Sequence, residues 1–146
     1  MATPTSTNDL ELPAASRVIG SDGIVATSTG LRVDIRLPWY RSLPLSTVEV
    51  GEVRISGNII DPAKVVFELE GKRFALGELA DQVSAVWYVL DSAYLDITAG
   101  PWKVGDELEL SVSLILYPPY IPGLKRMTVQ AKNLRLHSNA PTGDNR

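Results

Sequence analysis

The residues that most often carry out catalysis or bind metals are scarce in this chain. Its 146 residues include a single histidine, His137, and no cysteine. Thiolate nucleophiles, disulfides, cysteine-bound zinc and multi-histidine metal sites are therefore excluded within the chain. A serine–histidine–aspartate triad would depend on His137 alone, and a lone histidine near a chain end is more often a surface side chain. The sequence thus predicts no catalytic residue and no metal ligand.

Closely spaced carboxylates are the other groups that could perform chemistry, because two acids can flank a glycosidic bond. Glu68 and Glu70 have such a spacing, as do Glu107 and Glu109. Both pairs occupy the polar phase of segments in which apolar and polar residues alternate. Surface charge is therefore the favoured interpretation of these pairs. The sequence has no dinucleotide-binding, phosphate-loop, nucleophile-elbow or zinc-protease motif.

Two proline-bracketed aromatic segments are the strongest candidates for binding. The first is Leu37-Pro38-Trp39-Tyr40-Arg41-Ser42-Leu43-Pro44-Leu45-Ser46. It combines Trp, Tyr and Arg, the side chains most enriched at interface hot spots. The second is Tyr117-Pro118-Pro119-Tyr120-Ile121-Pro122. We interpret the following residues as a subunit-interface or substrate-pocket loop: Pro38, Trp39, Tyr40, Arg41, Ser42, Tyr117 and Tyr120.

Each aromatic segment also has a purely structural interpretation. Trp39 falls on the inward phase of its strand and could close one end of the core, whereas Tyr40 and Arg41 are better placed to reach outward. The second segment follows a strand whose outward phase becomes apolar at Ile115 and Tyr117, so something should cover that end. A neighbouring loop of the same domain would serve as well as another subunit.

The elements that position these segments are strands, because apolar residues recur with a period of two. The clearest alternation covers residues 108–116, and a second covers residues 31–39. About eight such segments predict an all-β fold, an antiparallel β-sandwich of jelly-roll type, because one open sheet would leave an apolar face in water. Residues 76–84 alone show helical spacing, so at most one short helix is expected.

Glycines mark the irregularities expected in these strands. The apolar phase inverts at Gly51, which predicts a bulge with a positive φ at this residue. Tight turns are expected at Gly57-Asn58 and at Gly71-Lys72, the second of which would close a hairpin.

The length of the chain fits a single domain. We assign residues 17–137 to the β-sandwich and predict flexible tails at residues 1–16 and 138–146, which are rich in small and polar residues. The formal net charge is −3, from 14 Lys+Arg against 17 Asp+Glu, and this balance argues against a nucleic-acid partner. No signal peptide or membrane-spanning run is recognised, so we expect a cytoplasmic protein with no membrane partner.

Three motifs together resemble the β subunit of bacterial C-glycoside deglycosidases. They are residues 37–46, the run Trp87-Tyr88-Val89-Leu90-Asp91 and the turn Pro119-Tyr120-Ile121-Pro122. The similarity extends from about Gly30 to His137. It implies a small β-sandwich protein that forms a hetero-oligomer with a larger TIM-barrel α subunit. The same resemblance places a divalent metal, Mn²⁺ or Mg²⁺, in the α subunit and implies no cofactor in this chain.

The resemblance also implies a lyase reaction in bacterial carbohydrate metabolism. The substrate would be a 3-oxo (3-dehydro) C-glucoside, such as an oxidised flavonoid C-glycoside. The ketone at C3 acidifies the proton at C2, a base removes that proton, the metal stabilises the enolate, and the aryl carbon leaves C1. Because the base and the metal belong to the α subunit in this family, the isolated chain is expected to be inactive.

The alternative function is a free-standing carbohydrate-binding β-sandwich module. In that interpretation Trp39, Tyr40, Trp87 or Trp102 would stack on sugar rings. Such a module would bind sugar when purified alone, whereas a lyase subunit would be inert without its partner.

Overall fold

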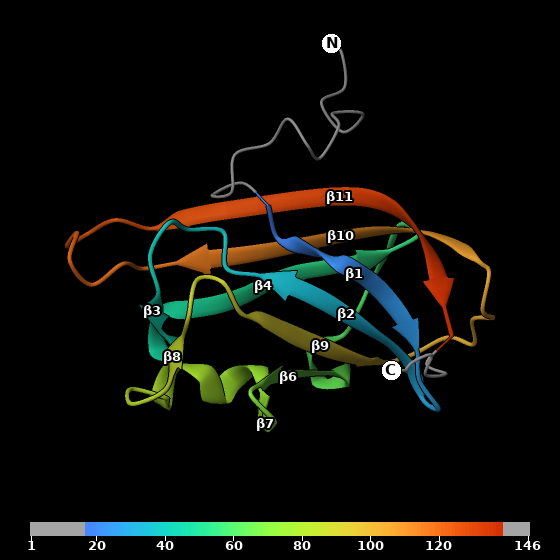
Figure 1. The fold of residues 1–146 in the computed structure, drawn as a ribbon, viewed down its shortest axis with the longest axis horizontal. Coiled ribbons are helices and arrows are strands. Elements are labelled where there is room, and N and C mark those ends of the chain that lie inside the picture. The colour runs from blue at the N-terminus through green and yellow to red at the C-terminus, as the bar shows by residue number, and fades with distance from the viewer. Residues whose placement is uncertain (1–16, 139–146) are drawn as a thin grey trace, which may run out of the picture.

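The computed structural model describes residues 17–138, which fold almost entirely into strands (Figure 1). The strands are β1 (Ile19–Ala26), β2 (Gly30–Arg36), β3 (Leu43–Pro44), β4 (Val48–Ile55), β5 (Asn58–Ile59), β6 (Val65–Leu69), β7 (Lys72–Ala75), β8 (Val86–Trp87), β9 (Ser92–Thr98), β10 (Glu107–Leu116) and β11 (Arg126–His137). The predicted all-β fold is confirmed. Eight of these strands have four or more residues, which matches the expected number, and β3, β5 and β8 are two-residue strands. Of the tails predicted at residues 1–16 and 138–146, all but Ser138 lie outside the described residues.

Most strands belong to one large curled sheet, an arrangement consistent with the predicted all-β sandwich. Nine strands form one sheet in the order β5-β4-β10-β11-β1-β2-β9-β6-β7, and β3 pairs with β8 in a separate two-stranded sheet. All described pairs are antiparallel except β1 with β11, which run parallel through Ile24↔Leu136 and Val25↔His137. This parallel pairing links the two halves, and the sheet curls around one apolar core (Figure 1).

The core forms because the alternating segments turn their apolar phase inward. Along β10 the residues Leu108, Leu110, Val112 and Leu114 are buried, and Glu107 and Glu109 on the other phase are exposed. From the opposite half of the sheet, Phe67 and Leu95 enter the same core. Burial of each such side chain contributes roughly 1.5–3 kcal/mol relative to its exposure.

The phase inversion at Gly51 is a β-bulge, as predicted. Val53 pairs with Val112 and Val50 pairs with Leu114, so Gly51 and Glu52 together oppose the single residue between those partners. The expected positive φ is wrong, because Gly51 is not among the described residues with positive φ. A bulge of the common type needs no left-handed residue. Close approach explains the glycine instead, since a Cβ at Gly51 would lie 3.0 Å from the Cβ of Ser113.

Both tight turns lie one residue earlier than predicted. The left-handed residues are Ser56 and Gly57 in the first turn, with φ of 51° and 85°, and Glu70 and Gly71 in the second, with φ of 53° and 82°. Two consecutive positive φ angles define the hairpin turn whose twist matches the flanking strands. Each glycine therefore occupies the second central position of its turn.

The remaining segments between strands contain little helix. Residues 76–84 were expected to form at most a short helix, and Leu76–Asp81 forms a 3₁₀ helix, with two shorter ones at Leu45–Thr47 and Pro62–Lys64. In the part of the chain that the structure describes, no helix has the length and apolar character needed to cross a membrane.

Candidate interaction site

The loop that follows β2 is fixed at both of its ends. Pro38 is buried at the start of the loop. At the other end, Leu43 is fully buried and pairs with Trp87 across the β3–β8 sheet. The Ser42 hydroxyl accepts a hydrogen bond of 2.9 Å from the backbone N–H of Val89. This anchoring leaves the Tyr40 and Arg41 side chains as the exposed part of the loop.

Trp39 is both a core residue and the centre of an aromatic cluster. Its side chain is only 5% exposed, as the inward phase predicted. The indole N–H donates a hydrogen bond to the hydroxyl of Tyr120, which lies 81 residues away in sequence. The Tyr40 ring lies 4.8 Å from the Trp39 ring, at an interplanar angle of 31°. The structure therefore brings both aromatic segments together at one end of the sheet.

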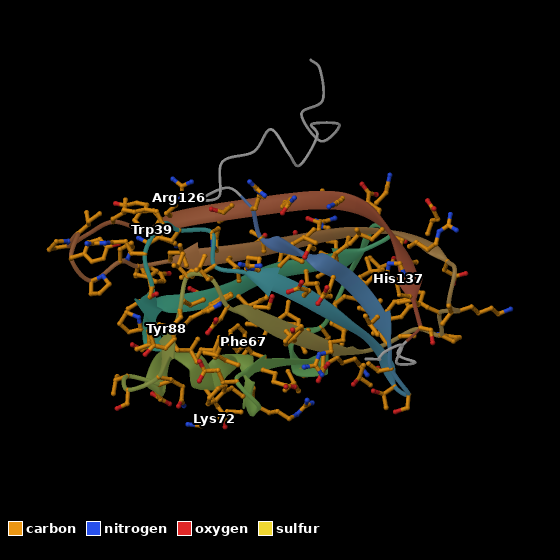
Figure 2. All side chains as sticks on the ribbon, viewed as in Figure 1. Trp39, Phe67, Lys72, Tyr88, Arg126 and His137 are labelled. Carbon is orange, nitrogen blue, oxygen red and sulfur yellow. The ribbon has the colours of Figure 1, made fainter. Side chains whose placement is uncertain are left out.

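Two arginines complete this cluster by stacking on its rings. The Arg41 guanidinium lies 5.0 Å from the centre of the Tyr120 ring, and the Arg126 guanidinium lies 5.6 Å from the Trp39 ring. Figure 2 shows Trp39 and Arg126 near one another at this end of the molecule. We define the aromatic cluster as Trp39, Tyr40, Arg41, Tyr120 and Arg126. Such cation–π contacts hold arginine side chains in place while their charge stays near the surface.

Tyr117 has a different environment from the aromatic cluster, although we grouped it with Tyr120 from the sequence. Its hydroxyl donates a hydrogen bond of 2.8 Å to Oε1 of Glu49 on β4. This hydrogen bond is the main cause that raises the pKa of Tyr117, and desolvation and the Glu49 charge act in the same direction. Ile115, which we expected to need a cover, is already nearly buried within the sheet.

Several exposed apolar residues at this end of the sheet were not identified from the sequence. Tyr88 and Leu90 are exposed in the loop before β9, and Met127 and Val129 are exposed on β11. The signal was present in β11, whose first half places its apolar residues on the outward phase and Thr128 and Gln130 on the buried phase. No sequence signal identifies Arg126 as part of the cluster, because its stacking on Trp39 arises only when the chain folds.

Gln130 explains the inverted pattern of β11. Its side-chain Oε1 accepts hydrogen bonds of 2.8 Å from the backbone N–H groups of both Val18 and Ile19. A buried amide at this position thus satisfies two backbone donors at the entrance to β1. The contact ties the start of β1 to β11.

Three of the titratable residues singled out from the sequence, His137, Glu107 and Glu68, lie far from the aromatic cluster or in ion pairs. His137 is exposed at the end of β11, far from the aromatic cluster (Figure 2). Glu107 pairs with Arg135 at 2.8 Å, and Glu68 pairs with Arg32 at 3.0 Å, so these carboxylates belong to surface ion pairs. No group of three or more His, Cys, Asp or Glu side chains within residues 17–138 could hold a metal ion.

The tryptophans are poorly placed to act as sugar-stacking platforms. Trp87 is fully buried, donates its indole N–H to the backbone carbonyl of Asp91 at 2.9 Å, and packs edge-on against Phe67. Trp39 is buried as described above, and Trp102 packs against the core. The platform interpretation is therefore wrong for Trp39 and Trp87, and Tyr40 is the most exposed ring of the proposed set.

Comparisons with known proteins agree on one family. A family model described as the C-glycoside deglycosidase beta subunit matches residues 17–120, which include the loop after β2 and extend to Tyr120. A 3'-dehydrocarminate deglycosidase beta subunit from a Microbacterium species is 37% identical over 106 residues, which cover 73% of this chain and 80% of that protein. A C-glycoside deglycosidase beta subunit from Microbacterium trichothecenolyticum is 38% identical over 93 residues, or 61% of this chain and 67% of that protein.

A third relative extends the similarity to another genus. The C-glycoside deglycosidase beta subunit of Arthrobacter globiformis is 30% identical over 107 residues, which cover 73% of this chain and 82% of that protein. The family model covers most of the described fold, and the names of the relatives denote one subunit of a deglycosidase. On these grounds the chain belongs to the family of C-glycoside deglycosidase beta subunits.

Proposed function

We propose that this chain is the β subunit of a C–C-cleaving C-glycoside deglycosidase and that the aromatic cluster contacts the α subunit. The observation that carries this proposal is the presentation of Tyr40 and Arg41 on a loop fixed at both ends. A preordered loop loses little entropy when it docks. Exposed Tyr and Arg side chains beside a buried Trp are typical of an interface hot spot.

The proposed reaction is an elimination performed by the complex. The substrate is a 3-oxo C-glucoside, such as a flavonoid C-glycoside already oxidised at C3 of its sugar. A base of the partner removes the acidic hydrogen at C2. The C1–C2 double bond then forms as the bond between C1 and the aryl carbon breaks, and the aryl carbon takes up a proton to give the free aglycone. We propose that this lyase acts in the cytoplasm of a bacterium.

We assign the catalytic base and the divalent metal to a TIM-barrel α subunit. The described residues of this chain do not fit a metal site, because they bring no three potential ligands together. In the proposed complex, Mn²⁺ or Mg²⁺ held by the α subunit would supply stabilisation of the negative charge that develops on the sugar oxygens. This chain then contributes to assembly, and the aromatic cluster is its contact surface.

Complex formation tests this proposal. The full chain is co-expressed with a candidate TIM-barrel α subunit, and one of the two carries an affinity tag. We expect the two proteins to co-purify and to elute together with a fixed stoichiometry in size-exclusion chromatography with light scattering. Elution of this chain by itself, together with saturable binding of free glucose by the isolated chain, would instead support the carbohydrate-binding module.

A further inference from the structure

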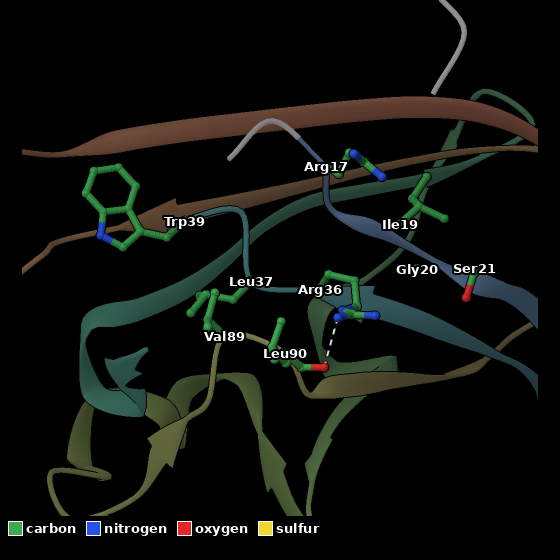
Figure 3. A pocket seen from close by; sticks show the side chains of 9 residues that line it. All are labelled: Arg17, Ile19, Gly20, Ser21, Arg36, Leu37, Trp39, Val89 and Leu90. Atoms are coloured by element: carbon green, nitrogen blue, oxygen red, sulfur yellow. Dashed lines mark hydrogen bonds between the residues drawn. The ribbon is translucent and has the colours of Figure 1, made fainter. Parts of the chain in front are cut away.

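The loop between β8 and β9 presents apolar side chains next to the aromatic cluster. This β8–β9 loop comprises residues 88–91, and its Tyr88 and Leu90 are 54% and 80% exposed. Val89 and Leu90 line the same pocket as Trp39, and Figure 3 shows them close to the loop that follows β2. Figure 2 places Tyr88 and Trp39 at the same end of the molecule. The β8–β9 loop therefore continues the exposed surface of the aromatic cluster.

Hydrogen bonds to two other parts of the chain fix the backbone of the β8–β9 loop. The N–H of Val89 donates to the Ser42 hydroxyl at 2.9 Å. The carbonyl of Leu90 accepts a hydrogen bond of 2.8 Å from Nη2 of Arg36, which Figure 3 draws as a dashed line. The exposed side chains of this loop are thus carried by an ordered backbone. Such a loop loses little entropy when a partner covers it.

The aromatic cluster alone is too small to hold two proteins together. A stable complex buries about 800 Å² on each partner. At roughly 200 Å² for a fully covered tyrosine, Tyr40, which is 64% exposed, offers about 130 Å², and Tyr120, which is 42% exposed, offers about 85 Å². Trp39 adds almost nothing, because it is 5% exposed. About 600 Å² remains to be found, more than Arg41 and Arg126 can supply, so a docked subunit must also cover neighbouring surface.

The β8–β9 loop offers neighbouring surface of a suitable kind. By the same measure Tyr88 contributes about 110 Å², and most of the Leu90 side chain is free to be covered. Single exposed apolar residues are common on protein surfaces. Here two of them share one anchored loop beside exposed Tyr and Arg side chains, which is the composition of an interface hot spot. The names of the relatives denote one subunit of a deglycosidase, so a partner chain is the expected cover.

We propose that the α subunit covers Tyr88 and Leu90 together with the aromatic cluster, as one continuous contact surface. The α subunit then presents apolar side chains to the β8–β9 loop. This inference rests on the proposed function and adds a second, separately anchored loop to the interface.

Calorimetric titration of the full chain with the purified α subunit tests this surface. Tyr88→Ala and Leu90→Ala should each raise the Kd about tenfold, because each removes apolar surface that the partner covers. The melting temperature of the chain should not change, since both side chains are exposed. The matched control is Ile59→Ala, which removes an isomer of leucine that is 59% exposed on β5 and should leave the Kd unchanged.

A fluorescent probe on the β8–β9 loop reports the contact directly. The chain contains no cysteine, so Leu90→Cys provides a single site for a thiol-reactive dye whose emission depends on its environment. Addition of the α subunit should shift the emission to shorter wavelength in a saturable way, because the partner excludes water from the dye. The same dye attached to Ile59→Cys should show no shift.

These measurements separate the inference from the proposed function. If the α subunit binds the unmodified chain and both alanine variants keep the unmodified Kd, or the dye at position 90 does not respond, the inference is refuted and the proposed function stands. If the α subunit does not bind the unmodified chain, both are refuted.

Two other occupants of the loop would also overturn the inference. Normal association of Tyr88→Ala and Leu90→Ala with a raised KM for the oxidised glycoside would place the loop in the substrate pocket. Self-association of the isolated chain in light scattering that is lost in these variants, while their Kd for the α subunit is unchanged, would assign the loop to a second copy of this chain.

Discussion

The substitution Tyr40→Ala tests the aromatic cluster with little risk to the fold, because 64% of the Tyr40 surface is exposed. A tyrosine buries roughly 200 Å² when fully covered, so docking can remove about 130 Å² of Tyr40 surface from water. At about 25 cal/mol per Å² this burial contributes about 3 kcal/mol, and ordering of the side chain costs about 1 kcal/mol. We therefore expect a loss of about 2 kcal/mol in association with the α subunit, or about thirtyfold in Kd.

Isothermal titration calorimetry of the two purified subunits measures this loss. Arg41→Ala should weaken association in the same direction, because the Arg41 guanidinium stacks on Tyr120 within the cluster. Val104→Ala is the matched control, since it removes an exposed apolar side chain shortly before β10, away from the cluster; Glu109→Ala is a control on the polar face. Normal association of both Tyr40→Ala and Arg41→Ala, with unchanged melting temperatures, would refute the interface. Normal association with a raised KM for the oxidised glycoside would place the loop in the substrate pocket instead.

Three further predictions concern the core, β11 and the Tyr117–Glu49 hydrogen bond. Trp39→Ala should lower the free energy of unfolding by about 3–5 kcal/mol, and Trp39→Phe by about 1–2 kcal/mol through loss of the hydrogen bond to Tyr120 and of part of the packing; urea denaturation of both variants checks this order. Gln130→Leu should lower the free energy of unfolding by about 2–3 kcal/mol, because it leaves the backbone N–H groups of Val18 and Ile19 without their acceptor. Hydrogen exchange at those two amides should accelerate, and unchanged exchange would contradict the proposed role of Gln130 in β11. Glu49→Ala should return the raised pKa of Tyr117 towards the ordinary tyrosine value. In the unmodified chain, the stability that comes from the raised pKa of Tyr117 is present below the ordinary tyrosine pKa and is lost as pH rises through the raised pKa. NMR titration of the Tyr117 ring measures the shift.

The predictable parts of the fold are the strands along which buried and exposed residues alternate. β10 and β2 pack one phase against the core, so each strand is visible in its own stretch of sequence. The pairing of β1 with β11 joins residues more than 100 positions apart. Neither segment contains a sequence pattern that predicts this pairing. The continuous sheet could therefore not be derived from local patterns.

The two hairpin turns were predicted correctly from their glycines, but each was placed one residue too late in the sequence. Glycine was expected to open each turn, yet Ser56 and Glu70 adopt left-handed conformations and the glycines follow them. Non-glycine residues tolerate such φ angles at a modest cost, which the paired strands outweigh. The amino-acid types alone do not show whether the non-glycine residue before or after the glycine adopts the left-handed conformation.

The candidate site was predictable in composition and only partly in geometry. The sequence singled out Trp39, Tyr40 and Arg41 and placed Tyr120 with them, and the structure brings these four together. Tyr117 does not join these four residues, because its hydroxyl donates a hydrogen bond to Glu49 instead. The role of this cluster in binding the α subunit stays a prediction.

Reconstitution of activity tests whether this chain functions as the β subunit of a lyase. Release of the aglycone from a 3-oxo C-glucoside is measured by chromatography with this chain alone, with the α subunit alone and with the two combined at equal concentration. We expect no release by this chain alone, and release by the mixture that saturates at a fixed stoichiometry. Full activity of the α subunit without this chain, or turnover by this chain alone, would contradict this expectation.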